Sequence, residues 1–175
     1  MRYIEPFCGS ACLFFHVQPP RAVLGDLNCE LIDTLRAVRN SPHHVLESIR
    51  RFRRGRAAYY ELRKKAVASL AQAERAARFV YLNRMCFNGI YRTNCRGEFN
   101  VPYGPPKNGG TVDEWLILSA ARVLDAALIV QGDFEKTLSH AAGNEFVYLD
   151  PPYYLDNRQV FREYGPGSFG CSSSL

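Results

Sequence analysis

Residues 2–15 read RYIEPFCGSACLFF, and this stretch decides the fold class. Residues 2–5 are predicted to form a short strand, residues 6–10 a turn of small residues, and residues 11–15 the opening of an apolar helix. A strand that passes through a tight turn directly into a helix is the repeating unit of α/β proteins. The segment therefore predicts an α/β fold with a mostly parallel sheet.

The same pattern returns along the chain. Residues 22–25, 128–130 and 146–149 are apolar and rich in β-branched or aromatic side chains, as buried strands are. Helical periodicity separates them, most clearly in residues 28–38 and 112–126. We expect these segments to complete a doubly wound sheet.

A basic block interrupts this pattern between the second and third predicted strands. Residues 57–84 show the longest helical periodicity in the chain and predict one long helix, whereas residues 87–110 hold too many Gly and Pro for a long regular element. We therefore interpret residues 41–110 as an insertion, and residues 1–40 and 111–175 as the core around it.

The charge of the chain is concentrated in this block. The 175 residues carry a net charge of +5, yet the span from Arg36 to Lys65 alone holds ten Lys and Arg against two Glu, a local balance of +8. Such a segment is typical of a protein that binds a polyanion. A solvated helix face explains the charge equally well, so charge alone leaves both interpretations open.

Composition excludes several classes of protein. A hydrophobic share of 47% and a charged share of 22% are ordinary for a globular chain of one domain with a small insertion. No stretch approaches the roughly 18 apolar residues of a membrane helix, and the first residues do not resemble a signal peptide. We expect a soluble intracellular chain.

The cysteine and histidine pattern predicts neither a disulfide framework nor a metal site. Adjacent His43 and His44 would point in different directions on a helix and could not share one metal ion. The six cysteines include no C-x-x-C pair, so we expect reduced thiols that act as small hydrophobic residues. They are Cys8, Cys12, Cys29, Cys86, Cys95 and Cys171.

Three predicted strand ends carry residues suited to one ligand, because ligands of doubly wound sheets bind at the carboxyl ends of the strands. The turn around Gly9 would let a ligand approach the backbone, although a tight turn needs a glycine in any case. Asp26 follows the second strand, where an acid can hold ribose hydroxyls or cap the next helix. Asp133 and Phe134 follow the third strand, where they could contact the edge and face of an adenine ring.

The fourth strand end, Asp150-Pro151-Pro152-Tyr153, is the most informative. Two prolines cannot continue a ladder, so they fix the acid and its neighbouring carbonyls rigidly. Methylation of an exocyclic amine needs this combination, because a carboxylate and a carbonyl aimed at the two amine hydrogens localise the nitrogen lone pair. An aromatic ring can then stack on the base. The alternative is a proline-rich turn without a catalytic role.

Together these motifs resemble the Dam-type DNA adenine methyltransferases, the DPPY or alpha group, over nearly the whole chain and in the order of that family. The long match in the block is the most specific, because DPPY-like tetrapeptides also occur in other amino-methyltransferases. The matching segments are YIEPFCGS (3–10), GDLN (25–28), LNRMCFNGIYRTN (82–94), GEFNVPYG (97–104), GDF (132–134) and DPPY (150–153).

The resemblance implies a Rossmann-like S-adenosylmethionine-dependent methyltransferase core and a target-recognition insertion. It implies methyl transfer to the 6-amino group of adenine in double-stranded DNA, with GATC as the first candidate site, and no metal. Phe7, Gly9 and Ser10 would surround the methionine part of S-adenosylmethionine. By position, Asp26 would hold its ribose, and its adenine would lie against Asp133 and Phe134.

The resemblance also assigns residues that would contact DNA. The target amine would be held by Asp150 and the Pro151 carbonyl, with Pro152 completing the motif and Tyr153 stacking on the flipped base. Arg92 matches a base-reading arginine, a kind of contact that provides about 1–3 kcal/mol of discrimination. Phe87 and Asn88 match residues that invade or prop the duplex, and phosphates would meet Arg84 and Asn94. The alternative role of these insertion residues is loop folding.

The chain departs from the family in three places. Ala11 replaces the second glycine of the cofactor motif, which is tolerable if the residue is already helical. No Lys/Gly-rich stretch precedes the first strand, and the chain ends 22 residues after Tyr153. We therefore expect a copy truncated at both ends, monomeric and cytoplasmic, from a bacterium or a phage. A catalytically inactive DNA-binding remnant, or a methyltransferase acting on RNA or protein, are the alternatives.

Overall fold

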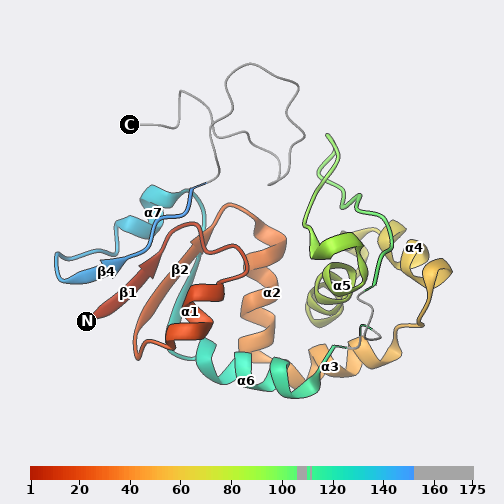
Figure 1. Cartoon of the computed structure of the whole chain (residues 1–175), viewed down its shortest axis with the longest axis horizontal. Coiled ribbons are helices and arrows are strands. Elements are labelled where there is room, and N and C mark those ends of the chain that lie inside the picture. Colours follow the sequence, from red (N-terminus) through yellow and green to blue (C-terminus); the bar gives the residue numbers. More distant parts are fainter. Residues whose placement is uncertain (106–109, 111, 152–175) are drawn as a thin grey trace.

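A four-stranded parallel sheet forms the centre of the protein (Figure 1). The structure is a computed structural model that describes residues 1–105, 110 and 112–151. The strand order is β3-β2-β1-β4, which confirms the predicted parallel α/β architecture. The strands are β1 (Arg2–Glu5), β2 (Ala22–Asp26), β3 (Ala127–Gln131) and β4 (Glu145–Val147).

β4 is shorter than residues 146–149, where the sequence predicted it. It ends at Val147, although the backbone N–H of Tyr148 still donates to the carbonyl of Ile4 at 2.9 Å. The strand therefore passes directly into the segment that carries Asp150 and Pro151.

Helices cover the two faces of the sheet unequally. The larger apolar cluster joins Tyr3, Leu24 and Ile129 of the sheet to several helices, among them α1 (Cys12–Val17), α2 (Cys29–Asn40) and α6 (Glu114–Leu124). The Asn28 side chain caps α2, because it accepts from the N–H of Leu31 at 3.2 Å.

The short helix α7 (Phe134–Leu138) packs on the opposite face, which presents a small cluster of Ile4, Val23 and Val130. Gly25 lies on this face of β2, since alternate residues of a strand share a face. A Cβ added to Gly25 would lie only 1.9 Å from Oγ1 of Thr137 in α7. Glycine at this position is therefore what allows α7 to approach the sheet so closely.

The strand order places a topological switch beside β1. The chain moves from β1 to β2 and β3 on one side, and then crosses to β4 on the other side of β1. In doubly wound sheets, a crevice at the carboxyl ends of the strands lies at such a switch point. This is the place where doubly wound folds bind their ligands.

Residues 57–84 do not form the single helix that their periodicity predicted. They divide into α4 (Arg56–Lys64), the short 3₁₀ turn Val67–Ser69 and α5 (Gln72–Met85). The break is stabilised by the buried Arg78, which donates to the carbonyl of Leu62 at 3.1 Å and to that of Arg63 at 2.8 Å. These carbonyls belong to the last turn of α4, where the regular helical pairing ends, and the Leu62 carbonyl also accepts from the N–H of Lys65 at 3.2 Å. Tertiary contacts thus override the local periodicity.

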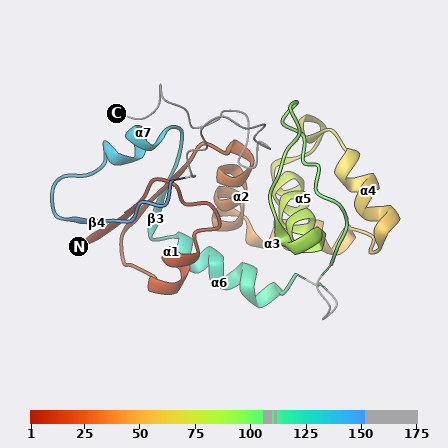
Figure 2. The same ribbon diagram turned by 45° about the horizontal axis from the view of Figure 1, so that its top comes forward.

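The predicted insertion packs around a second apolar cluster (Figure 2). This cluster joins α4 and α5 to the irregular segment that follows them, through Tyr59, Leu82, Phe99 and Val101. By contrast, α3 (Pro42–Arg51) and the first half of α5 contribute to the first cluster, beside the sheet. The division of the chain at residues 40 and 110 therefore stays a prediction.

The cysteine prediction is confirmed in part. Cys8 and Cys86 are buried, as small hydrophobic residues would be, whereas Cys12, Cys29 and Cys95 are exposed, so the prediction is wrong for these three. All five thiols are free, and Cys171 lies outside the described residues. Among the helices of the described part, none is long and apolar enough to cross a membrane.

Candidate active site

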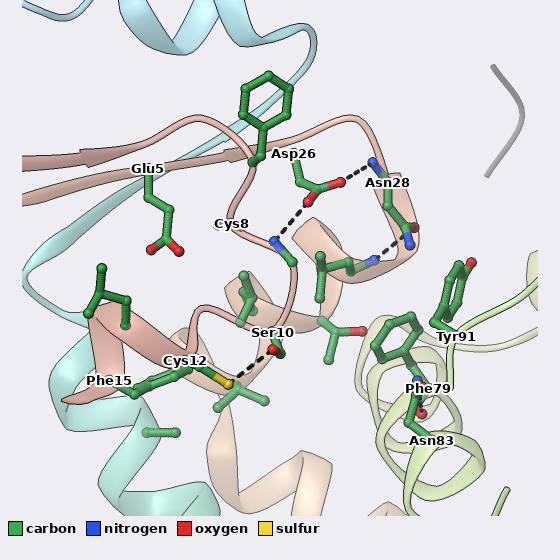
Figure 3. Close-up of a pocket in the computed structure, with 18 of the residues that line it drawn as sticks. Glu5, Cys8, Ser10, Cys12, Phe15, Asp26, Asn28, Phe79, Asn83 and Tyr91 are labelled. Atoms are coloured by element: carbon green, nitrogen blue, oxygen red, sulfur yellow. Dashed lines mark hydrogen bonds between the residues drawn. The ribbon is translucent and has the colours of Figure 1, made fainter. Parts of the chain in front are cut away.

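A cavity of about 1710 Å³ opens at the carboxyl end of the sheet, at the topological switch. The loops after all four strands line one wall, and α5 with the segment after it lines the opposite wall (Figure 3). The cavity brings together residues that lie up to 146 positions apart in the sequence, since Glu5 and Pro151 both line it. Predicted site residues that line it are Phe7, Gly9, Ser10, Asp26, Arg84, Asp133, Phe134, Asp150 and Pro151.

Asp26 connects the two loops that leave β1 and β2. Its Oδ2 accepts from the backbone N–H of Gly9 at 2.9 Å, and its Oδ1 accepts from that of Asn28 at 2.8 Å (Figure 3). The carboxylate therefore organises both turns, and both bonds are of the stronger charge-assisted kind. The fold gives Asp26 a structural role in addition to any contact it makes with a ligand.

The first and third strand ends meet through two aromatic rings. The rings of Phe7 and Phe134 stack with centroids 5.5 Å apart and an interplanar angle of 26°. Asp133 is exposed and caps α7, since its Oδ1 accepts from the N–H of Glu135 at 3.1 Å. The predicted aromatic and acidic residues thus lie together beside the cavity.

Ala11 is not helical, so the condition under which a methyl group was expected to be tolerable is not met. The residue has φ 53° and ψ 34°, in the left-handed region that favours glycine, and it immediately precedes α1. Its side chain is nevertheless fully buried in the first apolar cluster, and it is absent from the lining of the cavity. The methyl group therefore strains the backbone but does not narrow the ligand space.

Glu5 is a candidate site residue that the sequence analysis missed. It is 3% exposed, lines the cavity from the end of β1, and accepts a hydrogen bond from the Tyr3 hydroxyl at 2.8 Å. Burial raises the pKa of Glu5 to about 7, the Tyr3 hydrogen bond opposes this shift, and the charge of Asp150 adds to it. The sequence did contain a signal that could have identified Glu5, because an acidic residue ends an otherwise apolar predicted strand.

The structure describes only the first half of the predicted catalytic motif, residues 150–153. Asp150 and Pro151 are exposed and line the cavity on the same side as Glu5, just beyond the end of β4. Pro152 and Tyr153 lie outside the described residues. The structure thus brings the predicted catalytic acid to the crevice that the predicted cofactor residues form.

The last turn of α5 and the segment after it present several predicted DNA-contacting residues at the surface. Arg84, Phe87 and Asn88 are exposed, and Asn88 adopts a left-handed conformation with φ 55°. The segment is closed by backbone bonds from Phe87 N–H to the Pro102 carbonyl and from Gly104 N–H to the Met85 carbonyl. A Cβ on Gly104 would lie 2.8 Å from Cα of Phe87, so this closure requires glycine.

Two of the predicted DNA-contacting side chains also hold the loop together. Arg92 donates through Nε to Oδ1 of Asn100 at 2.9 Å. Asn94 closes the following turn, because its Oδ1 accepts from the N–H groups of Arg96 and Glu98 and its amide donates to the Glu98 carboxylate. Loop folding was the alternative for these residues, and their contacts with DNA stay predictions.

The basic segment is partly engaged in folding. Arg36 and Arg39 of α2 each donate at 2.8 Å to a carbonyl of the edge strand β3, and Arg63 donates to the Val101 carbonyl at 2.9 Å. The connection from α3 to α4, which carries exposed Arg53 and Arg54, lies at the lower right of Figure 1. The segment after α5 extends toward the upper part of that view. The exposed arginines of the α3–α4 connection and the predicted DNA-contacting segment therefore lie at different ends of the molecule.

In the residues that the structure describes, no three His, Cys, Asp or Glu side chains gather closely enough to hold a metal ion. The polar side chains that line the cavity include the carboxylates of Glu5, Asp26 and Asp150, amides, hydroxyls and the guanidinium of Arg84. Such a set suits an organic ligand with hydroxyl and cationic groups.

Comparison with known proteins decides the family. The family model of the D12 class N6 adenine-specific DNA methyltransferases matches residues 1–171 of this chain. The chain belongs to this family. Its parallel sheet, with the crevice at the switch point, is consistent with the Rossmann-like methyltransferase fold of the D12 class.

Individual D12-class relatives are similar over nearly the whole chain. The type II methyltransferase M1.LlaDCHI of Lactococcus lactis is 39% identical, with 99% of this chain and 64% of the relative covered. The type II methyltransferase M.MjaIII of Methanocaldococcus jannaschii is 32% identical, covering 99% and 66%, respectively. A DNA adenine methylase of Haemophilus influenzae is 33% identical, covering 97% and 61%. The chain thus spans somewhat less than two thirds of the length of these relatives.

Proposed function

We propose that this chain provides the cofactor site and the recognition segment of a site-specific DNA methyltransferase. The reaction is transfer of a methyl group from S-adenosylmethionine to the 6-amino group of adenine in double-stranded DNA. The single observation that carries the proposal is the cavity at the switch point. In this member of the D12 class, the cavity is lined by the residues of the predicted cofactor motifs and also by Asp150.

The cavity residues fit S-adenosylmethionine, which supplies an activated methyl group on a sulfonium. Gly9 and Ser10 leave room near the backbone for the methionine part, beside the ring of Phe7. Asp26 would accept from the ribose hydroxyls, while Asp133 and Phe134 would contact the edge and face of the adenine. The buried carboxylate of Glu5 adds a partner for a cationic group of the ligand.

Asp150 would act on the target amine. Together with the carbonyl of Pro151 it would accept hydrogen bonds from the two amine hydrogens, favour a pyramidal nitrogen and localise its lone pair for attack. The resemblance assigns Pro152 to the same rigid turn and stacking on the flipped base to Tyr153. A base must leave the duplex to reach this crevice, because its target atom is otherwise inside the stack.

The insertion would supply the DNA contacts. In this proposal Arg92 reads a base edge, Phe87 and Asn88 enter or support the duplex, and phosphates meet Arg84 and Asn94. Exposed arginines of residues 41–110 would add a salt-dependent affinity that is independent of sequence. GATC is the first sequence to test.

The deciding test is transfer of a tritiated methyl group from S-adenosylmethionine to unmethylated duplex DNA, followed by digestion to nucleosides. We expect the label in 6-methyladenine, and none when an equal amount of RNA or protein replaces the DNA. A folded chain that binds duplex DNA and cofactor without transferring methyl would instead support an inactive DNA-binding protein. Label in RNA or protein would overturn the assignment of the acceptor.

A further inference from the structure

Tyr91 occupies a special position between the two walls of the cavity. It belongs to the segment after α5, directly before Arg92, and its ring packs against Phe79 and Phe99 with centroids 5.4 and 5.8 Å away. Its hydroxyl crosses to the opposite wall and donates to Oε2 of Glu30, in the first turn of α2, at 3.3 Å. The residue therefore joins the segment that would read DNA to α2, the helix that begins directly after Asn28. Figure 3 shows Tyr91 beside Phe79, across the cavity from Asp26.

Glu30 is itself anchored on its other side. Its Oε1 lies 3.7 Å from Nη1 of the buried Arg78, the residue that also binds the carbonyls at the end of α4. A buried guanidinium needs a counter-charge, and Glu30 provides it. The carboxylate is thus held in place by α5 while it receives the hydroxyl of Tyr91.

The first turn of α2 links this hydroxyl to the loop after β1 that carries Gly9, which we call the cofactor loop. Asn28 is the N-cap of α2, two residues before Glu30, and its backbone N–H donates to Oδ1 of Asp26 at 2.8 Å. Asp26 in turn holds the N–H of Gly9. The first turn of α2 therefore contacts the proposed ribose ligand on one side and the recognition segment on the other.

The Tyr91 hydroxyl is well suited to hold a fixed hydrogen bond. Burial, and next the negative charge of Glu30, raise the pKa of Tyr91 above its usual range. The phenol therefore keeps its proton at neutral pH and remains a donor. A phenylalanine at this position would keep the packing against Phe79 and Phe99 and lose only this bond.

We propose that Tyr91 is a positioning residue that couples the cofactor loop to the DNA-recognition segment through Glu30 and Asn28. The inference rests on the proposed function and deepens it, since it concerns how the two parts of that site are held together. Ligand binding at Asp26 and Gly9 would stabilise the first turn of α2 and, through Tyr91, the segment that carries Arg92. Such coupling between sites is reciprocal and typically changes an equilibrium about 5- to 150-fold.

Amide hydrogen exchange of residues 86–94 tests this inference without requiring turnover. Exchange is measured with and without S-adenosylhomocysteine for the wild-type chain, Tyr91→Phe and the control Tyr59→Phe, and binding is measured by calorimetry in the same samples. Tyr59 is a matched control because its hydroxyl donates to the Val101 carbonyl, which keeps Arg63 as a second donor. We expect the ligand to slow exchange about tenfold in the wild type and in Tyr59→Phe, and little in Tyr91→Phe.

The outcomes separate the two proposals. If Tyr91→Phe binds the ligand and shows the same ligand-dependent slowing as the wild type, the positioning role is wrong while the proposed function stands. A purely structural role of the hydroxyl would raise exchange equally with and without ligand, which also contradicts the inference. If the folded wild-type chain does not bind S-adenosylhomocysteine, the proposed cofactor site fails, and the coupling with it.

Discussion

The two walls of the cavity are built on different principles. On the sheet wall, Asp26 receives two backbone N–H groups and Glu5 receives a hydroxyl, so the polar groups are fixed before any ligand arrives. On the helical wall, the exposed Arg84 lies in the last turn of α5, and the segment that follows, whose exposed Phe87 and Asn88 lie outside the cavity lining, is closed mainly through its backbone. The first wall suits a small ligand of one fixed shape, and the second suits a large partner that docks from outside.

The two walls therefore differ in how much their polar side chains contribute to the stability of the fold. Charge-assisted bonds to backbone N–H groups are stronger than neutral ones, so changes on the sheet wall should affect both folding and ligand binding. Exposed side chains on the helical wall contribute little to stability, so changes there should affect recognition alone. Substitutions in each wall can therefore test whether stability and recognition depend on the two walls in this different way.

The largest effect is expected for Asp150→Ala, which removes the acceptor for the target amine. Loss of a preorganised electrostatic contact to a reacting group typically costs about 10²–10³-fold in rate or more, whereas DNA binding should be retained. Tritium transfer and a DNA-binding titration measure the two properties. The control is Asp125→Ala, an exposed acid at the end of α6. Turnover close to wild type in Asp150→Ala would remove Asp150 from the mechanism.

Asp26→Asn should weaken cofactor binding and lower stability together. An asparagine side chain has one acceptor oxygen, and its NH₂ group cannot accept a hydrogen bond. One of the two N–H groups, of Gly9 or of Asn28, therefore loses its partner, at a cost of about 1–3 kcal/mol in stability. Calorimetry with S-adenosylmethionine and thermal unfolding report the two losses. Asp33→Asn is the matched control, since that exposed acid makes only a surface ion pair 3.7 Å from Arg36. A loss of stability with unchanged affinity would restrict Asp26 to folding.

Arg92→Ala should relax sequence choice by about 1–3 kcal/mol at one base position while leaving nonspecific affinity nearly unchanged. The comparison variant is Arg54→Ala, at the exposed α3–α4 connection. If that connection contacts phosphates, its loss weakens binding uniformly and reduces the salt slope by about one. Methylation of a library of duplex sites at several salt concentrations distinguishes the two. A uniform loss for Arg92→Ala would reassign this residue to phosphate or to the loop.

Glu5 should make both stability and cofactor binding depend on pH. Its pKa rises from 4.5 unfolded to about 7 folded, so its favourable contribution is complete below pH 4.5 and is lost as the pH rises through 7. Glu5→Gln should therefore gain stability relative to wild type between pH 5 and pH 8, by at most about 3 kcal/mol. Binding of the cationic ligand should strengthen over the same range in the wild type only. If stability and ligand affinity changed with pH in the same way in wild type and in Glu5→Gln, the raised pKa of Glu5 would be contradicted.

Ala11→Gly should have the smallest effect. Glycine relieves left-handed strain of about 1–2 kcal/mol but gives up a buried methyl worth about 0.8 kcal/mol, so the two changes nearly cancel. Affinity for S-adenosylmethionine should stay unchanged, because the methyl group does not face the cavity. A clear gain in affinity, measured by calorimetry, would show that Ala11 does narrow the ligand space.

The sequence by itself determined the α/β class, the four strands and the cluster of polar residues at their ends. These follow from local apolar runs and from the rule that parallel strands bring their carboxyl ends to one edge, which is why Asp26 and Asp150 could be placed together. The roles of the segment 82–104 came from the resemblance, because its Gly- and Pro-rich pattern specifies no regular element. The family comparison agreed with that resemblance.

Only the tertiary structure decided what depends on contacts between distant residues. The helix predicted over residues 57–84 breaks because Arg78 binds carbonyls 15 and 16 positions earlier, a contact that no local periodicity encodes. Burial, with a smaller contribution from the charge of Asp150, raises the pKa of Glu5, and Ala11 is held in a left-handed conformation inside the first apolar cluster. The link from Tyr91 to Glu30 spans 61 positions of sequence. Sequence patterns report short-range preferences, whereas these features arise where the folded chain brings remote side chains into one low-dielectric space.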